Sequence, residues 1–115
     1  WPVCLASPLR DVYKRQDFYR GRLQERFGLE VLVPDAEDRR SVHDIIYQEL
    51  IAGVVSEQSR QVYAAVIARL VARGAEAIIL GCTEIMLLVR PEDSAVPLFD
   101  TTTLHARAAV DAALA

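Results

Sequence analysis

Cys82 is the residue whose chemistry and position are most informative. It stands in Gly81-Cys82-Thr83-Glu84, directly after the apolar run Ala77–Leu80, which is typical of a buried strand of a parallel sheet. Open α/β sheets bind their ligands at the carboxyl ends of such strands. A thiol there could act as a base or a nucleophile. It could also simply fill space, because free cysteine is among the most buried residue types.

The residues that follow Cys82 predict a helix over 83–89. The first N–H groups of a helix have no partner within it and can bind an anion such as a carboxylate. The same positive end would lower the pKa of a nearby thiol and favour the thiolate. This arrangement would suit a base or nucleophile beside a bound carboxylate.

Composition restricts the classes of protein to consider. The 115 residues carry a net charge of −3, and the basic residues form no stripe, so nucleic-acid binding is not supported. No apolar run approaches the roughly 18 residues of a membrane span. Cys4 and Cys82, in a chain without a clear signal peptide, indicate the reducing cytoplasm. We find neither a zinc-type cluster nor a phosphate-binding glycine loop, so we expect no metal.

Hydrophobic periodicity predicts helices alternating with strands, which is typical of an α/β fold with a parallel sheet. Helices are expected over 17–27, 37–52, 57–73, 83–89 and 102–114, and strands over 29–33, 76–80 and 96–99. Ser56 is a plausible N-cap, and Pro97 favours an edge or strand-start position. Asp100 is expected to cap the last helix. Three strands are few for such a sheet, so we expect the chain to be incomplete.

Residues 1–16 differ in character from the rest. They show neither strand alternation nor a strong helical stripe, and Asp11–Gln16 resembles a tail that recurs at the ends of translated metagenomic contigs. We therefore divide the chain into a non-native leader, 1–16, and a native part, 17–115. The alternative is a genuine basic leader or irregular arm.

From Asp17 onward the chain resembles the C-terminal part of a cofactor-independent aspartate/glutamate racemase, closest to the aspartate racemase branch. The matching stretches are Asp17–Leu23, Val33–Asp35, Ile45–Leu50, Gly74–Glu76, Gly81–Ile85 and Pro97–Thr101, followed by His105-Ala106. The resemblance implies a protein of two similar α/β lobes with the substrate between them. This chain would then supply most of the second, flavodoxin-like lobe, and the full-length parent would be a homodimer.

The resemblance also implies a reaction, in which one cysteine from each lobe acts on opposite faces of a small amino acid. One thiolate removes the α-proton and the other thiol returns a proton, without a cofactor. Cys82 matches the second-lobe cysteine, whereas the usual first-lobe Cys-Asn-Thr segment is absent and Cys4 does not match it. We therefore expect this chain to be inactive alone.

Thr83 and Glu84 match substrate-binding positions of the family. The alternatives are helix capping by Thr83 and a first-turn acid at Glu84. Glu84 stands where glutamate racemases carry histidine, which favours the aspartate branch. His105 is expected to face solvent or pack, with a catalytic role as the alternative. Many relatives have lysine at the position of Ala52, so aspartate, glutamate and other amino acids remain open as substrates.

Two further functions are compatible with these motifs. Another member of the same superfamily, such as a hydantoin racemase or a maleate isomerase, would also use a cysteine pair. A catalytically silent α/β domain would use Cys82 for packing alone.

A flavodoxin-like strand order of 2-1-3-4 makes a prediction about pairing. Strand 29–33 should not pair directly with 76–80, because the first strand lies between them. Either Val3–Leu9 fills that gap as a substitute strand, or the sheet is split and its apolar faces are open. The helix over 102–114 should expose an Ala/Leu/Val face that packs on the missing lobe in the parent.

Overall fold

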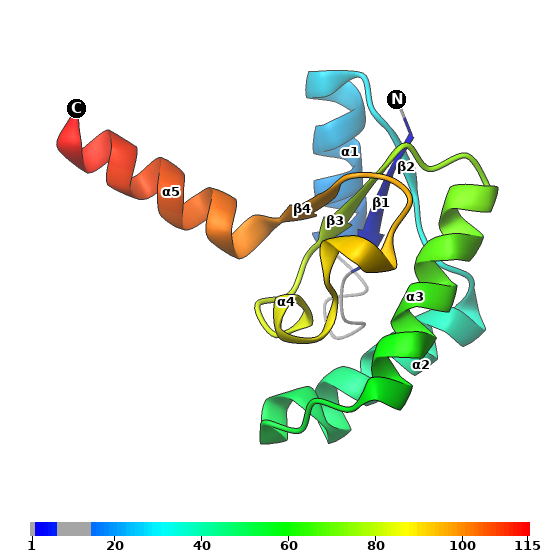
Figure 1. Cartoon of the computed structure of the whole chain (residues 1–115). Helices are drawn as coiled ribbons and strands as arrows, with labels where there is room; N and C mark the ends of the chain where they lie inside the picture. The colour runs from blue at the N-terminus through cyan, green and yellow to red at the C-terminus, as the bar shows by residue number, and fades with distance from the viewer. Residues whose placement is uncertain (1, 7–14) are drawn as a thin grey trace.

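A computed structural model describes residues 2–6 and 15–115. Trp1 and residues 7–14, all within the predicted leader, lie outside the described residues. The strands are β1 (Pro2–Ala6), β2 (Glu30–Leu32), β3 (Ala77–Leu80) and β4 (Leu98–Asp100). The helices are α1 (Arg15–Phe27), α2 (Ala36–Gln48), α3 (Glu57–Ala72), α4 (Ile85–Leu88) and α5 (Thr101–Leu114), with single 3₁₀ turns at η2 (Leu50–Ala52) and η3 (Pro91–Asp93). The predicted alternation of strands and helices is confirmed (Figure 1).

The strands of the described residues form one parallel sheet in the order β2-β1-β3-β4. Val3 pairs with Val31 on one side and with Ala77 on the other, so β1 separates β2 from β3. The flavodoxin-like order is therefore confirmed, and residues 2–6 fill the gap, whereas 7–9 lie outside the described residues. The non-native origin of 1–16 stays a prediction.

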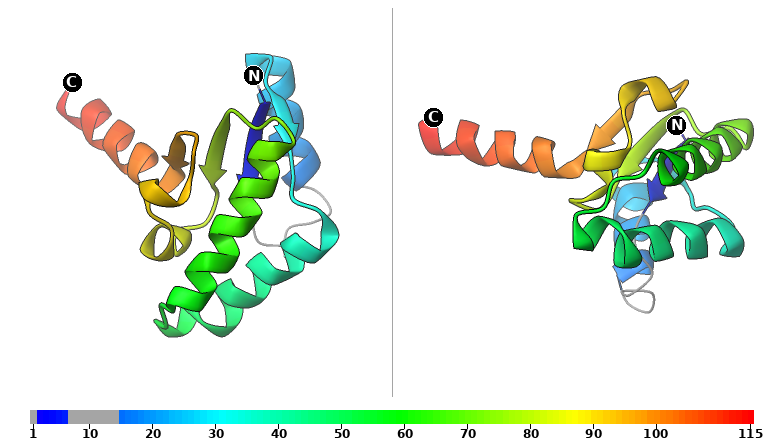
Figure 2. Two further views of the ribbon diagram at one scale, coloured as in Figure 1. Left: turned by 45° about the vertical axis from the view of Figure 1, so that its right-hand side comes forward. Right: turned by 60° about the horizontal axis from the view of Figure 1, so that its bottom comes forward.

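Alternate residues of the strands pack on opposite faces of the sheet. Val31 and Ile79 lie on the face covered by α1, with Leu23 and Leu29 against them. Ile78 and Leu80 lie on the other face, in the main core with α2 and α3. Figures 1 and 2 show this layering, with α2 and α3 side by side. Both faces of the sheet centre are therefore closed.

The ends of α2 and α3 follow local capping chemistry. Ser56 caps α3, as predicted, because its Oγ accepts a hydrogen bond from the N–H of Ser59. Gly53 has φ of +78°, a left-handed conformation that glycine adopts without steric cost. The single helix predicted over 37–52 is too long, because the structure divides this range into α2 and the 3₁₀ turn η2. Glu49, at φ −120° and ψ −64°, ends α2, and the backbone tightens into η2 before Gly53.

The helix predicted over 83–89 is also shorter than expected, because α4 is a single turn, Ile85–Leu88. Glu84 precedes it without a side-chain capping bond, and Val89 is extended with ψ of +133°. Two causes act at its end. Val89 turns inward to be buried, and Arg90 precedes Pro91, which disfavours a helical conformation there. Cys82 therefore lies in a turn ahead of one helical turn.

The C-terminal part forms the edge of the sheet and then leaves it. Pro97 directly precedes β4, an edge strand, which agrees with the predicted edge or strand-start position. The strand itself begins and ends later than the predicted range of 96–99. Asp100 caps α5 by accepting a hydrogen bond from the N–H of Thr102 at 3.0 Å, also as predicted. From residue 103 onward α5 is exposed, and it projects from the body of the molecule (Figure 1). Its large apolar side chains, Leu104, Val110 and Leu114, are exposed as expected.

Within residues 2–6 and 15–115, no helix is both long enough and apolar enough to cross a membrane.

Candidate functional site

Cys82 lies two residues beyond the carboxyl end of β3, at the edge where parallel sheets bind ligands. The neighbouring strand is tied to β3 at this edge. Asp100 pairs with Leu80 in the sheet register, and the Thr101 hydroxyl donates to the Leu80 carbonyl at 2.9 Å. The ends of β3 and β4 therefore present a fixed edge from which the turn of Cys82 begins.

Cys82 and Glu84 are in direct contact. The Cys82 thiol donates a hydrogen bond to Glu84 Oε2, with 2.8 Å between sulfur and oxygen. Both side chains are half-buried, whereas Thr83 between them is exposed. Of the three predicted site residues, the structure thus joins the thiol and the carboxylate and leaves Thr83 open to solvent.

The environment of Cys82 favours the neutral thiol. Burial raises its pKa, and the hydrogen bond and negative charge of Glu84 raise it further. The N–H groups of Glu84 and Ile85 donate toward the sulfur and act in the opposite direction, but more weakly. The predicted lowering of the thiol pKa is therefore wrong. One helical turn supplies little positive field, and the sequence did not reveal the burial.

Glu84 is the charged member of the pair. Its pKa is lowered, first by the hydrogen bond from the Cys82 thiol and then by the side chain of Thr83. A carboxylate therefore faces a protonated thiol near neutral pH. The thiol can deliver its proton to a basic atom placed beside the sulfur.

Tyr63 supports the site and was not identified from the sequence. It is 2% exposed on α3, and its hydroxyl donates to the Val42 carbonyl at 3.2 Å. Burial raises the pKa of this hydroxyl, and the proximity of Cys82 raises it further. The thiol thus has a buried aromatic side chain nearby. The sequence signal for this residue was a tyrosine within an apolar helical stripe, because a hydroxyl buried there needs a hydrogen-bond partner.

The remaining candidates do not join this pair. Asp100 caps α5, and His105 is exposed on α5, in agreement with the solvent-facing interpretation. Within the part of the chain that the structure describes, no cluster of three His, Cys, Asp or Glu side chains could hold a metal ion. The chemistry available at this edge is therefore that of a thiol and a carboxylate.

Comparison with known proteins places this chain in a family. A family model described as Asp/Glu/Hydantoin racemase matches residues 12–109. A solved structure from Yersinia pestis, named as an Asp/Glu racemase, is 51% identical with a TM-score of 0.85. An aspartate racemase homologue from Pyrococcus horikoshii OT3 is 31% identical with a TM-score of 0.83.

Both comparisons cover 99% of this chain, but only 48% and 49% of the respective relatives. The chain therefore spans about half the length of the solved structures that it matches.

Proposed function

Because this chain belongs to the Asp/Glu/hydantoin racemase family, we propose that it is part of an enzyme that racemises an acidic amino acid, aspartate or glutamate. The observation that carries the proposal is the Cys82 thiol hydrogen-bonded to the Glu84 carboxylate at the carboxyl edge of the sheet. A thiol in this position can exchange a proton with a substrate α-carbon without a cofactor.

In the proposed reaction, Cys82 serves one face of the substrate. When it acts as the acid, the S–H bond breaks, a C–H bond forms at the α-carbon and the sulfur becomes a thiolate. The raised pKa of the thiol suits this role, because it keeps the proton on sulfur until a carbanion approaches. In the reverse direction, the thiolate left on Cys82 removes the α-proton, so the C–H bond breaks and the S–H bond forms again.

The other face of the substrate requires a second acid–base group. We place that group, with the other wall of the site, in the half of the relatives' length that this chain does not cover. We assign to the exposed Thr83 the contact with the substrate carboxylate. The enzyme would be a homodimer, as the resemblance implies.

The proposal is tested in a whole protein that carries this sequence, assayed by chiral chromatography with L- and D-aspartate and glutamate. Cys82→Ala should abolish racemisation while circular dichroism shows the fold intact. Glu92→Gln, an exposed change on η3, is the matched control, and it should keep full activity. Activity of Cys82→Ala beyond a few per cent of the parent would overturn the assignment.

The family description also includes hydantoin racemases. A hydantoin substrate therefore belongs in the same assay. Its turnover, without turnover of either amino acid, would replace the proposed substrate while leaving the role of Cys82 in place.

A further inference from the structure

Residues 81–97, which carry Cys82 and Glu84, cross from β3 to β4 with few directional attachments to the rest of the molecule. From Glu84 to Ser94, the backbone–backbone hydrogen bonds that the structure describes stay within the segment. Ile85, Leu88 and Val89 are buried and hold it against the core. Apolar contacts are non-directional, so they fix the depth of the segment better than its orientation.

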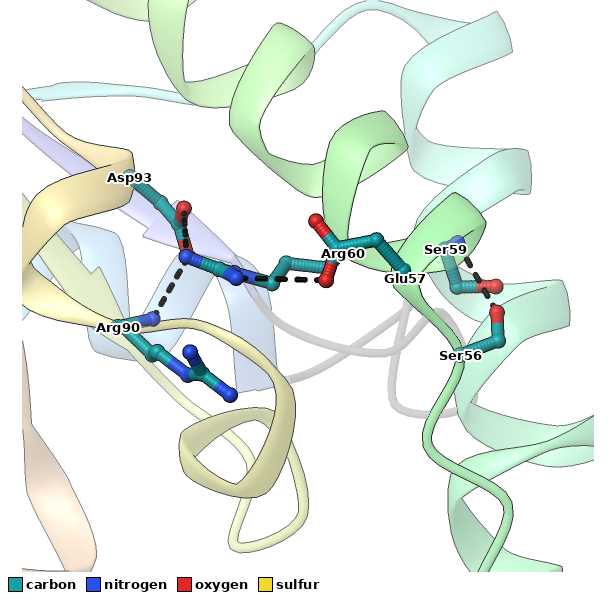
Figure 3. Close-up of polar contacts among 6 residues, drawn as sticks. All are labelled: Ser56, Glu57, Ser59, Arg60, Arg90 and Asp93. Atoms are coloured by element: carbon teal, nitrogen blue, oxygen red, sulfur yellow. Dashed lines mark hydrogen bonds and ion pairs between the residues drawn. The ribbon is translucent and has the colours of Figure 1, made fainter.

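One polar attachment is directional. Arg60, on α3, donates from Nε and Nη2 to the two carboxylate oxygens of Asp93, and both distances are 2.9 Å. Figure 3 shows this pair together with Arg90, whose N–H donates to Asp93 Oδ2 at 2.8 Å. The side chains of Arg60 and Asp93 are only 19% and 10% exposed. A partly buried, bidentate pair of this kind has strict geometry.

The backbone of α4 and hydrogen bonds at both of its ends connect this anchor to the thiol. Asp93 holds the backbone of Arg90, directly after the turn that α4 makes. At the other end of that turn, the N–H of Leu87 donates to the Glu84 carbonyl at 3.1 Å. The Glu84 carboxylate then accepts from Cys82. Cys82 lies two residues after the end of β3, whereas Glu84 directly precedes α4. Rotation of α4 about its apolar contacts would therefore displace Glu84 from the thiol.

We propose that Arg60 is a positioning residue for the site: acting through Asp93, it orients the segment so that the Glu84 carboxylate faces the Cys82 thiol. The importance of the Glu84–Cys82 contact for catalysis rests on the proposed function, but its positioning by Arg60 does not. Arg60 takes no part in the chemistry.

The test follows the pH dependence of Cys82 alkylation by iodoacetamide in the 115-residue chain. Peptide mass mapping scores Cys82 separately from Cys4. Arg60→Gln should release Glu84, lower the thiol pKa and speed alkylation near neutral pH by about tenfold. Arg69→Gln is the matched control, because Arg69 lies on the same helix as Arg60 and makes a similar bidentate pair, with Asp38 of α2. It should leave the pH profile unchanged.

A double variant tests the route of the effect. If Arg60 acts through Glu84, adding Arg60→Gln to Glu84→Gln should shift the profile little beyond Glu84→Gln alone. An unchanged profile in Arg60→Gln, equal shifts in Arg60→Gln and Arg69→Gln, or additive shifts in the double variant would overturn the proposal.

A second pair of variants covers the case in which Arg60→Gln does not fold. Arg60→Lys keeps the charge but loses the bidentate fork, and Asp93→Asn weakens the acceptor; both should shift the profile in the same direction. An unchanged profile in folded Asp93→Asn would also overturn the proposal. If the whole protein shows no racemase activity while these shifts occur, the proposed function fails and the positioning role stands.

Discussion

At the scale of single residues, the protonation of Cys82 follows from a balance of opposed effects. Burial and the Glu84 carboxylate favour the thiol, while two backbone N–H groups favour the thiolate and are outweighed. The result is a protonated thiol next to an ionised carboxylate. A site of this kind suits reprotonation of a carbanion better than attack by a free thiolate.

Replacement of Glu84 tests this balance. In Glu84→Gln the negative charge beside the sulfur is lost, so the thiolate is less disfavoured and the Cys82 pKa should fall. Alkylation of Cys82 near neutral pH should become faster, while racemisation by the whole protein should slow. The measurement is the alkylation rate against pH. Glu92→Gln, an exposed change on η3, is the control, and a profile that does not move in Glu84→Gln would contradict the assigned role.

The sequence identified these residues but not their protonation. The order of Ala77–Leu80 and Cys82 was enough to place a thiol at the carboxyl end of a strand. Its burial depends on tertiary neighbours such as Tyr63, which lies on α3 and not in the turn of Cys82. A prediction based on the helix terminus alone therefore gave the wrong direction for the pKa.

At the scale of elements, the turn after Cys82 shows how side-chain burial overrides local propensity. The sequence 83–89 favours a longer helix, yet α4 ends at Leu88, where Val89 becomes extended and is buried, and Arg90 precedes Pro91. The resulting α4 inserts Ile85 and Leu88 into the core beside Cys82. The pair Arg60–Asp93 joins residues 33 positions apart, and nothing in the local sequence pattern indicates it.

Two adjacent leucines allow a matched test of how α4 is held. Leu88 is 1% exposed, whereas Leu87 is 61% exposed. Leu88→Ala should lower the free energy of unfolding by about 2–5 kcal/mol, because it removes buried methyl groups and leaves a cavity. Leu87→Ala should change it by no more than about 0.5 kcal/mol. Urea denaturation followed by circular dichroism measures both, and equal effects would contradict the packing of α4.

At the scale of the whole molecule, the order of the strands was predictable and the source of the central strand was not. Alternating elements and the parallel-sheet rule gave 2-1-3-4. Residues 2–6 lacked a clear strand pattern, yet their backbone pairs with both β2 and β3. A central strand in a parallel sheet obtains its pairing from both neighbours, so tertiary context outweighs weak local propensity there.

The coverage of about half of each relative leads to a functional prediction. The purified 115-residue chain should not racemise L- or D-aspartate or glutamate, because in the proposed reaction the Cys82 thiol serves only one face of the substrate. Chiral chromatography after prolonged incubation measures this directly. The whole protein, assayed in parallel, is the positive control, and turnover by the chain alone would refute the division of the site between two halves.

The projecting helix gives the last prediction. Only three of the fourteen residues of α5, namely His105, Arg107 and Asp111, have ionisable side chains, and its apolar side chains are exposed. A helix that is apolar on most sides is normally covered. The isolated chain should therefore associate with rising concentration in sedimentation velocity. Val110→Asp with Leu114→Asp should weaken that association, whereas Arg107→Glu, which removes no apolar surface, should leave it largely unchanged. If the unsubstituted 115-residue chain stays monomeric at all concentrations, the apolar side chains of α5 need no cover.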